Sequence, residues 1–204
     1  MKLEKSKTSI PVPKLKTSVD RKERLFDAAI ILFSELGFHG VAVPKIAKEA
    51  GISTGSIYNY FESKEDLVNQ LFWFWKNELK LYYLNGYPAD ASIKDQFEFI
   101  WARLHKYTHD HPQAFLFIEG HMHASYLNQD CLDLEEEVFE IGRMFIRAGQ
   151  AKGVIRKADP QLLVGFFFGA FVQYFKDCRA SRQKWTKANS FAVRDFCWTS
   201  LSIS

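Results

Sequence analysis

The sequence has few cysteines and no long apolar run, and each shortage excludes a class of protein. Its three cysteines (Cys131, Cys178 and Cys197) are too scattered for a disulfide framework or a paired-cysteine metal site, so we expect reduced, buried thiols. The longest apolar run, residues 162–172, is far shorter than the roughly 20 residues of a membrane-spanning helix. No apolar segment follows the basic N-terminus, so no secretory signal is predicted. We therefore expect a soluble, cytoplasmic protein that does not contact a membrane.

Net charge is also small, at +3, and alone gives no argument for a nucleic-acid partner. Its distribution is more informative, because residues 1–24 hold eight Lys or Arg and three acidic residues, a net +5 that leaves −2 for the rest. Such polarity favours a polyanion near the N-terminus. Residues 1–18 are basic and contain two prolines, so we predict a flexible basic arm. Two roles for the arm stay open: contact with DNA, and solubilisation.

Helical periodicity is what the sequence has in abundance. Of its 204 residues, 47% are hydrophobic, and apolar stripes with helical spacing recur along the chain. The first stripe comprises Leu25, Ala29, Leu32, Phe33 and Leu36. No segment shows the alternation of a strand, so the predicted fold class is all-α, with about nine helices. A three-helix helix-turn-helix domain is predicted over residues 19–66, joined to a larger helical domain over 67–204.

The stretch Gly51-Ile52-Ser53-Thr54-Gly55 has two competing interpretations. It matches the Gly-x-Ser-x-Gly pattern of serine hydrolases, whose serine stands on a sharp turn from a strand into a helix. Residues 44–50 are predicted to be helical, and no strand is predicted anywhere, so an enzyme using Ser53 is disfavoured. In the alternative, Gly51 supplies the left-handed residue of a helix-turn-helix and Ser53 caps a third helix over about 54–60.

The helix-turn-helix interpretation accounts for more of the sequence. Ile46, Ile57 and Phe61 can close a small core over the first helix. The third helix then presents hydroxyl, amide and phenol groups that can contact phosphates and base edges, although a merely solvated polar face would look similar. Asn59 is a candidate adenine reader, and Gly55 permits close backbone approach. The predicted DNA-binding residues are Lys45, Ser53, Thr54, Gly55, Ser56, Tyr58, Asn59, Tyr60 and Lys64.

A longer motif surrounds this stretch. It reads Val43-x-x-Ile46-Ala47-Lys48-Glu49-Ala50-Gly51-Ile52-Ser53-x-Gly55-Ser56-Ile57-Tyr58-x-Tyr60-Phe61-x-Ser63-Lys64-Glu65-x-Leu67. This segment resembles the DNA-binding signature of TetR-type transcriptional repressors, and the resemblance extends back to about Arg21. It implies that the third helix enters the major groove, that Ser56 and Tyr58 touch the DNA backbone, and that Lys64 contacts a phosphate. Two positions depart from the family pattern: Ala42 replaces a capping Thr or Ser, and Thr54 replaces a frequent Lys or Pro.

The resemblance also implies a function for the helical body. Double-stranded DNA, a second copy of the chain and a small-molecule effector are the implied partners: a homodimeric repressor would bind a palindromic operator and be released by an apolar or aromatic ligand. The candidate ligand-binding residues are Phe72, Trp75, Phe97, Trp101, Phe117, Met122 and Phe168. The candidate dimer residues, on the last two helices, are Gly165, Phe167, Gly169, Ala170, Phe171, Tyr174 and Trp198. Ordinary core packing is the competing explanation for both sets.

Five histidines lie close together in the sequence, at His105, His109, His111, His121 and His123. His105 and His109 are spaced i, i+4 and could share a metal ion, but ordinary surface and core histidines explain the cluster better. We predict no metal site, no cofactor and no enzymatic activity. The alternative function is a helical protein-interaction module without specific DNA binding, whose aromatic body binds a partner chain.

Overall fold

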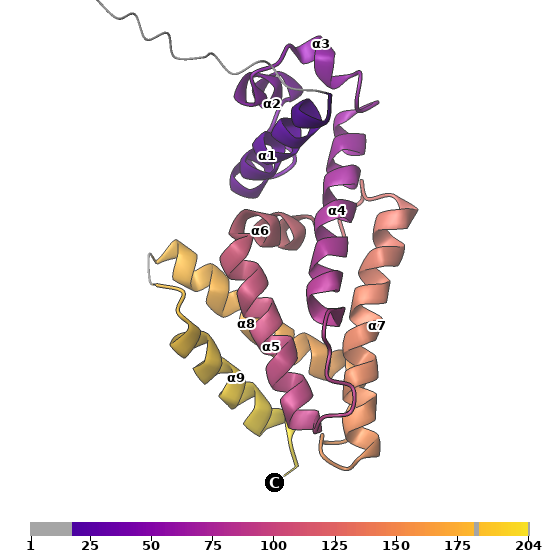
Figure 1. Cartoon of the computed structure of the whole chain (residues 1–204), viewed down its shortest axis with the longest axis vertical. Helices are drawn as coiled ribbons and strands as arrows, with labels where there is room; N and C mark the ends of the chain where they lie inside the picture. Colours follow the sequence, from indigo (N-terminus) through magenta and orange to yellow (C-terminus); the bar gives the residue numbers. More distant parts are fainter. Residues whose placement is uncertain (1–17, 182–183, 204) are drawn as a thin grey trace, which may run out of the picture.

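The computed structural model describes residues 18–181 and 184–203, and these form nine helices. They are α1 (Ser18–Leu36), α2 (Val43–Ala50), α3 (Thr54–Ile57), α4 (Lys64–Leu84), α5 (Ile93–Asp110), α6 (Pro112–His121), α7 (Gln129–Ala151), α8 (Pro160–Ala180) and α9 (Lys187–Leu201). Figure 1 shows α1–α3 at one end of an elongated molecule, with α4 running from them into the body. The predicted all-α fold is confirmed. Within the described ranges, the only strand-like pairing is an isolated bridge between Ile155 and Ser202.

The three N-terminal helices close around the small core that the sequence predicts. Phe33, Ile46, Ile57 and Phe61 are all buried there. Gly51 ends α2 in the left-handed region, with φ of 67°, which glycine adopts without strain. The α-helical part of α3 is shorter than predicted and ends at Ile57. The reason is local: the amide of Tyr60 donates to the carbonyl of Ile57, an i−3 bond that tightens the chain into a turn.

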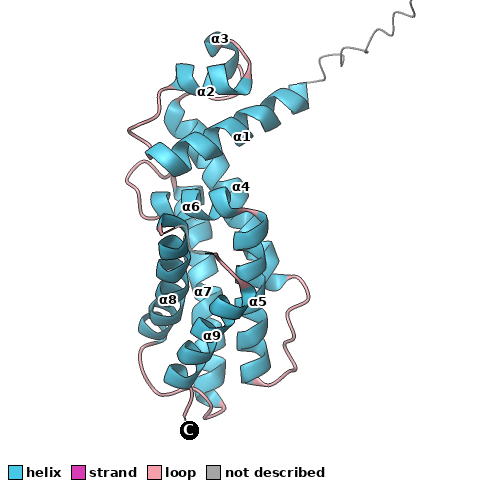
Figure 2. Ribbon diagram, turned by 90° about the vertical axis from the view of Figure 1, so that its left-hand side faces the viewer, coloured by secondary structure: helices cyan, strands magenta, loops and turns pink. Residues whose placement is uncertain are grey.

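Helix α4 joins the N-terminal helices to the body. Ser63 caps it by accepting a hydrogen bond from the amide of Asp66 at 3.0 Å, and two acidic residues in the first turn complement the helix dipole. The helix then runs unbroken to Leu84, so the domain boundary predicted at residues 66–67 falls inside it. Its N-terminal turns contact α1, where Phe74 lies 6.0 Å from Phe26 between ring centroids, and its remaining turns belong to the body (Figure 2).

The body is a bundle of the remaining helices around an aromatic core. Helix α4 packs on α5 and α7, α8 packs on α7 and α9, and α5 packs on α9. Trp101 and Phe171 meet edge to face in its centre, with ring centroids 5.2 Å apart. Helix α6 contacts both α1 and α4, so it connects the body to the N-terminal helices. None of the described helices has the length and apolar character needed to span a bilayer.

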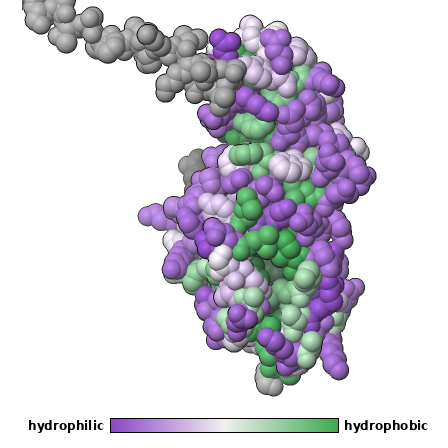
Figure 3. Space-filling model, turned by 45° about the vertical axis from the view of Figure 1, so that its right-hand side comes forward, coloured by the Kyte–Doolittle hydropathy of each residue, from purple (hydrophilic) through white to green (hydrophobic). Residues whose placement is uncertain are grey.

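Some apolar side chains lie on the surface. Leu36, expected on the buried stripe of α1, is exposed, because helical spacing fixes the direction of a side chain but not how far the neighbouring helix extends. On the face drawn in Figure 3, apolar surface gathers on the body, below the N-terminal helices. The three cysteines are buried free thiols, as the sequence predicts.

Candidate functional site

The predicted DNA-binding residues lie together at the end of the molecule formed by α2, α3 and the start of α4 (Figure 1). Five of them are exposed: Lys45, Ser53, Gly55, Tyr58 and Asn59. The other four, Thr54, Ser56, Tyr60 and Lys64, are half-buried. The exposed surface of α3 and the turn after it is thus polar but carries no charged side chain.

Ser53 and Ser56 hold the start of α3 in shape. The Ser53 hydroxyl oxygen accepts a hydrogen bond from the Ser56 amide at 3.3 Å and lies 2.7 Å from the Ser56 hydroxyl. Ser53 therefore acts as the predicted helix cap. The residues before it form α2 and a turn rather than a strand, so the setting that a hydrolase serine requires is not present in this part of the chain.

Gly55 is not required by the fold around it. Among the described residues, a Cβ built at this position meets no heavy atom within 4 Å, and its backbone does not need a positive φ. The packing of the chain therefore gives no reason for a glycine. A backbone that must come close to an external surface gives one, since any side chain would hold that surface away.

Lys64 links this surface to the body of the protein. Its ammonium lies over the ring of Phe38, 4.1 Å from the ring centroid, and that ring stacks on Tyr126 with centroids also 4.1 Å apart. Tyr126 stands in the segment between α6 and α7. The cation at the start of α4 is thus held in place by an aromatic pair that spans the two parts of the chain.

The structure adds nothing to two features of the expected DNA contact, the residue before α2 and the N-terminal arm. Ala42 precedes α2 without any side-chain cap, as its chemistry requires, so the capping hydroxyl usual in the family is missing. The predicted basic arm lies almost wholly outside the described residues, which begin at residue 18.

A cavity of about 400 Å³ lies in the body between α4, α5, α7 and α8. Most of its lining is aliphatic or aromatic, including Leu79, Ile100, Phe139, Phe145 and Phe167. Of the seven candidate ligand residues, Phe168 lines it and six do not. Those six are Phe72, Phe97, Trp101 and Phe117, which are fully buried in the core, and Trp75 and Met122, which are half-buried.

The polar side chains of the lining were not among the predicted residues. They are Lys76, Tyr83, Tyr87, Gln96 and Lys152. Tyr87 donates to the Gln96 side chain at 2.7 Å, and the Gln96 amide group donates to the carbonyls of Ala89 and Ala91, so this pair is satisfied. Lys76 is 2% exposed, and burial lowers the pKa of its ammonium group. The sequence could have indicated that Lys76 is buried, since it follows Phe72 by four residues and so lies on the buried stripe of α4.

The candidate dimer residues divide between the surface and the core. Gly165 and Gly169 are exposed on α8, Ala170, Tyr174 and Trp198 are half-buried, and Phe167 and Phe171 are buried. The Phe167 ring packs edge to face on Phe97 at 5.6 Å, within the body. Leu162 and Phe166 on α8 and Phe196 on α9 are instead exposed, so the outer faces of the last two helices carry apolar side chains beside the glycines.

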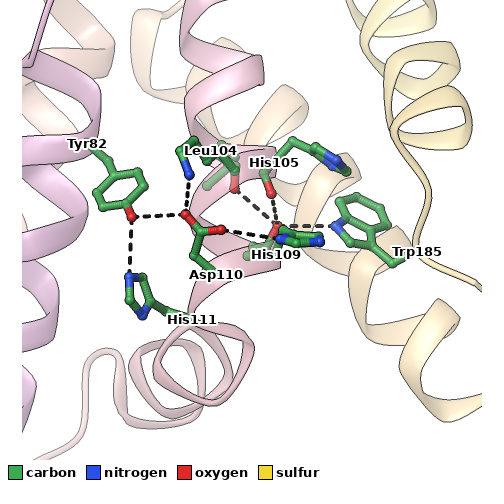
Figure 4. Close-up of polar contacts among 9 residues, drawn as sticks. Tyr82, Leu104, His105, His109, Asp110, His111 and Trp185 are labelled. Atoms are coloured by element: carbon green, nitrogen blue, oxygen red, sulfur yellow. Dashed lines mark hydrogen bonds and ion pairs between the residues drawn. The ribbon is translucent and has the colours of Figure 1, made fainter.

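The histidines do not converge on one point. His109 pairs with Asp110 at 3.2 Å, while His111 lies 3.3 Å from the Tyr82 hydroxyl on the opposite side of Asp110 (Figure 4). His121 contacts the Phe117 carbonyl at 2.8 Å, and His123 pairs with Glu135 at 2.7 Å. Across residues 18–181 and 184–203, no three His, Cys, Asp or Glu side chains are placed to hold a metal ion.

Comparison with known proteins agrees with this geometry. Residues 25–71 match the family described as bacterial regulatory proteins of the tetR family, and residues 76–203, more than half of the chain, match the tetracyclin repressor-like C-terminal domain. The transcriptional regulator RutR of Escherichia coli K12 is 32% identical over 163 residues, covering 77% of this chain and 74% of RutR.

Solved structures share the fold over nearly the whole chain. A TetR-family regulator from Marinobacter aquaeolei VT8 superimposes with a TM-score of 0.79 at 19% identity, covering 91% of this chain and 97% of that one. The regulator FadR from Bacillus subtilis gives 0.73 at 22% identity, covering 88% and 98%. A helix-turn-helix with a polar reading surface, carried on a helical body with a cavity, defines a ligand-responsive class of DNA-binding regulators. The chain belongs to the TetR family of transcriptional regulators.

Proposed function

We propose that this regulator is a homodimeric repressor that binds a palindromic operator through α3 and is released when a small apolar molecule enters the body. The observation that carries the proposal is the surface of α3, which is polar, uncharged and built around Gly55. Such a surface suits contact with base edges, because hydroxyl and amide groups read them without the indiscriminate attraction of lysine or arginine for phosphate. A regulator of bacterial genes would meet its operator in the cytoplasm.

The outer faces of α8 and α9 support the homodimer. Gly165 and Gly169 are exposed, and no atom of residues 18–181 or 184–203 lies within 4 Å of a Cβ built at either position, so a second copy could approach the helix backbone closely. Phe196, which is 74% exposed, and Phe166 offer apolar area beside this stripe. Two-fold symmetry would set the two copies of α3 about 34–36 Å apart, on successive major grooves of DNA.

The cavity supports a small apolar effector. Its volume of about 400 Å³ and its largely apolar wall fall in the range of small-molecule sites. The B. subtilis regulator with this fold was crystallised with stearoyl-CoA, so a body of this architecture accommodates an acyl ligand in that protein. A ligand that binds one arrangement of the body more tightly than another would shift the population of the dimer away from the DNA-binding arrangement.

Selection of bound duplexes from a random pool, carried out with the full chain at two salt concentrations, tests the proposal. We expect enrichment of a palindromic site whose half-sites lie one helical turn apart, retained at the higher salt. The stoichiometry of the complex on that site gives the number of chains bound.

Binding that shows no sequence preference and disappears at the higher salt would contradict specific recognition and leave only the charge of the N-terminal residues. In that case the protein-interaction alternative would gain support. A specific site bound by a single chain would contradict the dimer alone.

A further inference from the structure

Lys76 is the one buried charge in the wall of the cavity. Its side chain is 2% exposed, whereas Lys152, the other cation of the lining, is exposed at the C-terminal end of α7. None of the residues that line the cavity is acidic. Charge inside this apolar chamber is therefore positive and comes from a single, deeply placed ammonium group.

The ammonium of Lys76 has no direct partner in the described part of the chain. It makes no hydrogen bond there and no ion pair within 4.0 Å. The Lys76 Nζ lies over the aromatic rings of Phe139 and Phe72, at 5.5 and 6.0 Å from their centroids. A buried lysine normally has a hydrogen-bonded or charged partner, because removing an ammonium group from water is costly. This one borders an open space instead.

Two carboxylates outside the cavity lining act on Lys76. Burial favours the neutral form of Lys76 and lowers its pKa, whereas Glu119 on α6 and Glu135 on α7 favour the charged form. Glu119 carries a buried oxygen without a hydrogen bond among the described residues. Burial raises the pKa of Glu119, and His123 pairs with Glu135 from outside. The two carboxylates therefore favour a charged Lys76, but neither forms an ion pair with it within 4.0 Å in the described part of the chain.

We propose that the effector is an apolar carboxylic acid whose carboxylate binds the Lys76 ammonium and whose hydrocarbon part fills the space between α5, α7 and α8. This assignment rests on the proposed ligand-responsive function and names the chemical class of its ligand. A carboxylate on Lys76 gains a charge-assisted hydrogen bond in a largely apolar cavity. The uncharged polar groups of the lining, on Tyr83, Tyr87 and Gln96, offer a neutral head group only weaker hydrogen bonds, and Lys76 repels a cationic one. Glu119 then loses part of its attraction to Lys76, which connects occupancy of the cavity to α6 and, through it, to α1.

Three ten-carbon probes that differ only in head group test the assignment: decanoate, decan-1-ol and decylamine. Their affinities for the full chain are measured by isothermal titration calorimetry at pH 7.5, below the concentrations at which they form micelles. We expect decanoate to bind about 10- to 100-fold more tightly than the other two, the factor that a hydrogen bond between charged groups provides. Lys76→Met, which retains the stem and removes the charge, should abolish that preference and leave decan-1-ol binding unchanged.

Lys152→Met is the matched control, since it removes the exposed cation of the same cavity and should leave the preference intact. Lys76→Arg keeps a cation and should keep decanoate as the best ligand. Circular dichroism and thermal unfolding report whether each variant folds. The head-group preference of the unsubstituted chain tests the ligand class by itself, and its persistence in Lys152→Met assigns the carboxylate to Lys76 even where the Lys76 variants do not fold.

Equal binding of decanoate and decan-1-ol, tighter binding of decylamine, or binding of none of the three would each overturn the assignment. Binding of the selected operator duplex is measured on the same preparation. A chain that binds its duplex but not decanoate refutes the acid ligand and leaves the regulator function standing. A preference for decanoate without any operator binding refutes the proposed function and leaves the ligand class standing.

Discussion

The Lys64 ammonium lies 4.1 Å from the centre of the Phe38 ring. The two residues stand on opposite sides of the helix-turn-helix in sequence, one after α1 and one at the start of α4. Because the ring restrains a long, flexible side chain, the cation is held near the proposed DNA-binding surface in the free protein, and less side-chain entropy would be lost if Lys64 contacts DNA.

Lys64→Met should weaken operator binding by about tenfold at all sequences tested and reduce the salt dependence by about one unit of slope, because one phosphate contact is lost. Binding to the selected duplex is measured by fluorescence anisotropy over a series of salt concentrations. Lys80→Met is the matched control: it removes a cation from the same helix, where Lys80 pairs with Glu137 on the body. An unchanged salt slope in Lys64→Met would exclude a phosphate contact by this side chain.

Asn59→Ala should relax specificity at one base pair in each half-site. A bidentate contact between an amide side chain and adenine is worth ~1–3 kcal/mol of discrimination, which corresponds to a roughly 5- to 150-fold preference. Competition with duplexes that carry each single-base change shows which position loses its preference. Asn85→Ala, at the opposite end of α4, serves as the control. A variant that binds every duplex more weakly by the same factor would show that Asn59 contacts the backbone of DNA rather than a base.

Gly169→Leu should dissociate the proposed dimer without harming the fold. A Cβ at this position meets nothing within 4 Å in the part of the chain that the structure describes, and leucine favours a helix over glycine by up to ~1 kcal/mol, so the protomer itself should tolerate the change. Sedimentation velocity at several concentrations measures the dimer affinity. Gly120→Leu is a matched control, because Gly120 is also an exposed helical glycine with open space beside it, on α6. A Gly169→Leu protein that remains dimeric would place the interface elsewhere.

Stability should fall as the pH drops below neutrality, in part through His121. Burial lowers the pKa of this side chain, so the unfolded chain binds the proton more readily than the folded one. Unfolding then takes up a proton between the folded pKa and the ordinary value near 6.5, and the free energy of unfolding decreases as pH falls through that window. Burial shifts the pKa of His105 in the same sense, whereas the raised pKa of Glu119 acts in the opposite sense.

The contribution of His121 is isolated by comparison with His121→Gln, which removes the titrating group and can still donate to the Phe117 carbonyl. Urea denaturation at pH 7.5, 6.5 and 5.5 should give a shallower pH dependence for this variant than for the unsubstituted chain. His39→Gln is the control, because His39 is exposed and makes no ion pair with the described residues. Parallel pH profiles for His121→Gln and the unsubstituted chain would contradict the role given to burial.

The parts of the fold that local chemistry governs could be predicted from the sequence. Ser53 accepts the amide hydrogen bond expected of a helix cap, and Ser63, Ser92 and Asp159 do the same in front of α4, α5 and α8. Gly51 has the left-handed backbone that ends α2. These outcomes depend on neighbours two to four residues away, so a single sequence contains the information.

The cavity could not be predicted in the same way. Periodicity shows which side chains turn inward, but not whether the space they face is filled. Phe97 and Trp101 face inward and pack against Phe167 and Phe171, whereas Phe145 and Ile100 border a void, although all have the same helical spacing. That difference arises from the lengths and crossing of helices far apart in the chain, which no local pattern records.

The length of helix α4 enlarges small movements of the body. Its 21 residues begin at Lys64 beside the reading surface and end at Leu84 in the wall of the cavity, a span of about 30 Å at 1.5 Å per residue. A rod of that length converts a tilt of about 5° at one end into a displacement of roughly 2.5 Å at the other, close to the length of a hydrogen bond. In the proposed dimer, a tilt of this size would change the separation of the two copies of α3, so that they no longer fit successive major grooves of DNA. A ligand bound at the cavity end of α4 would then act on the DNA-binding end without reshaping the rest of the body.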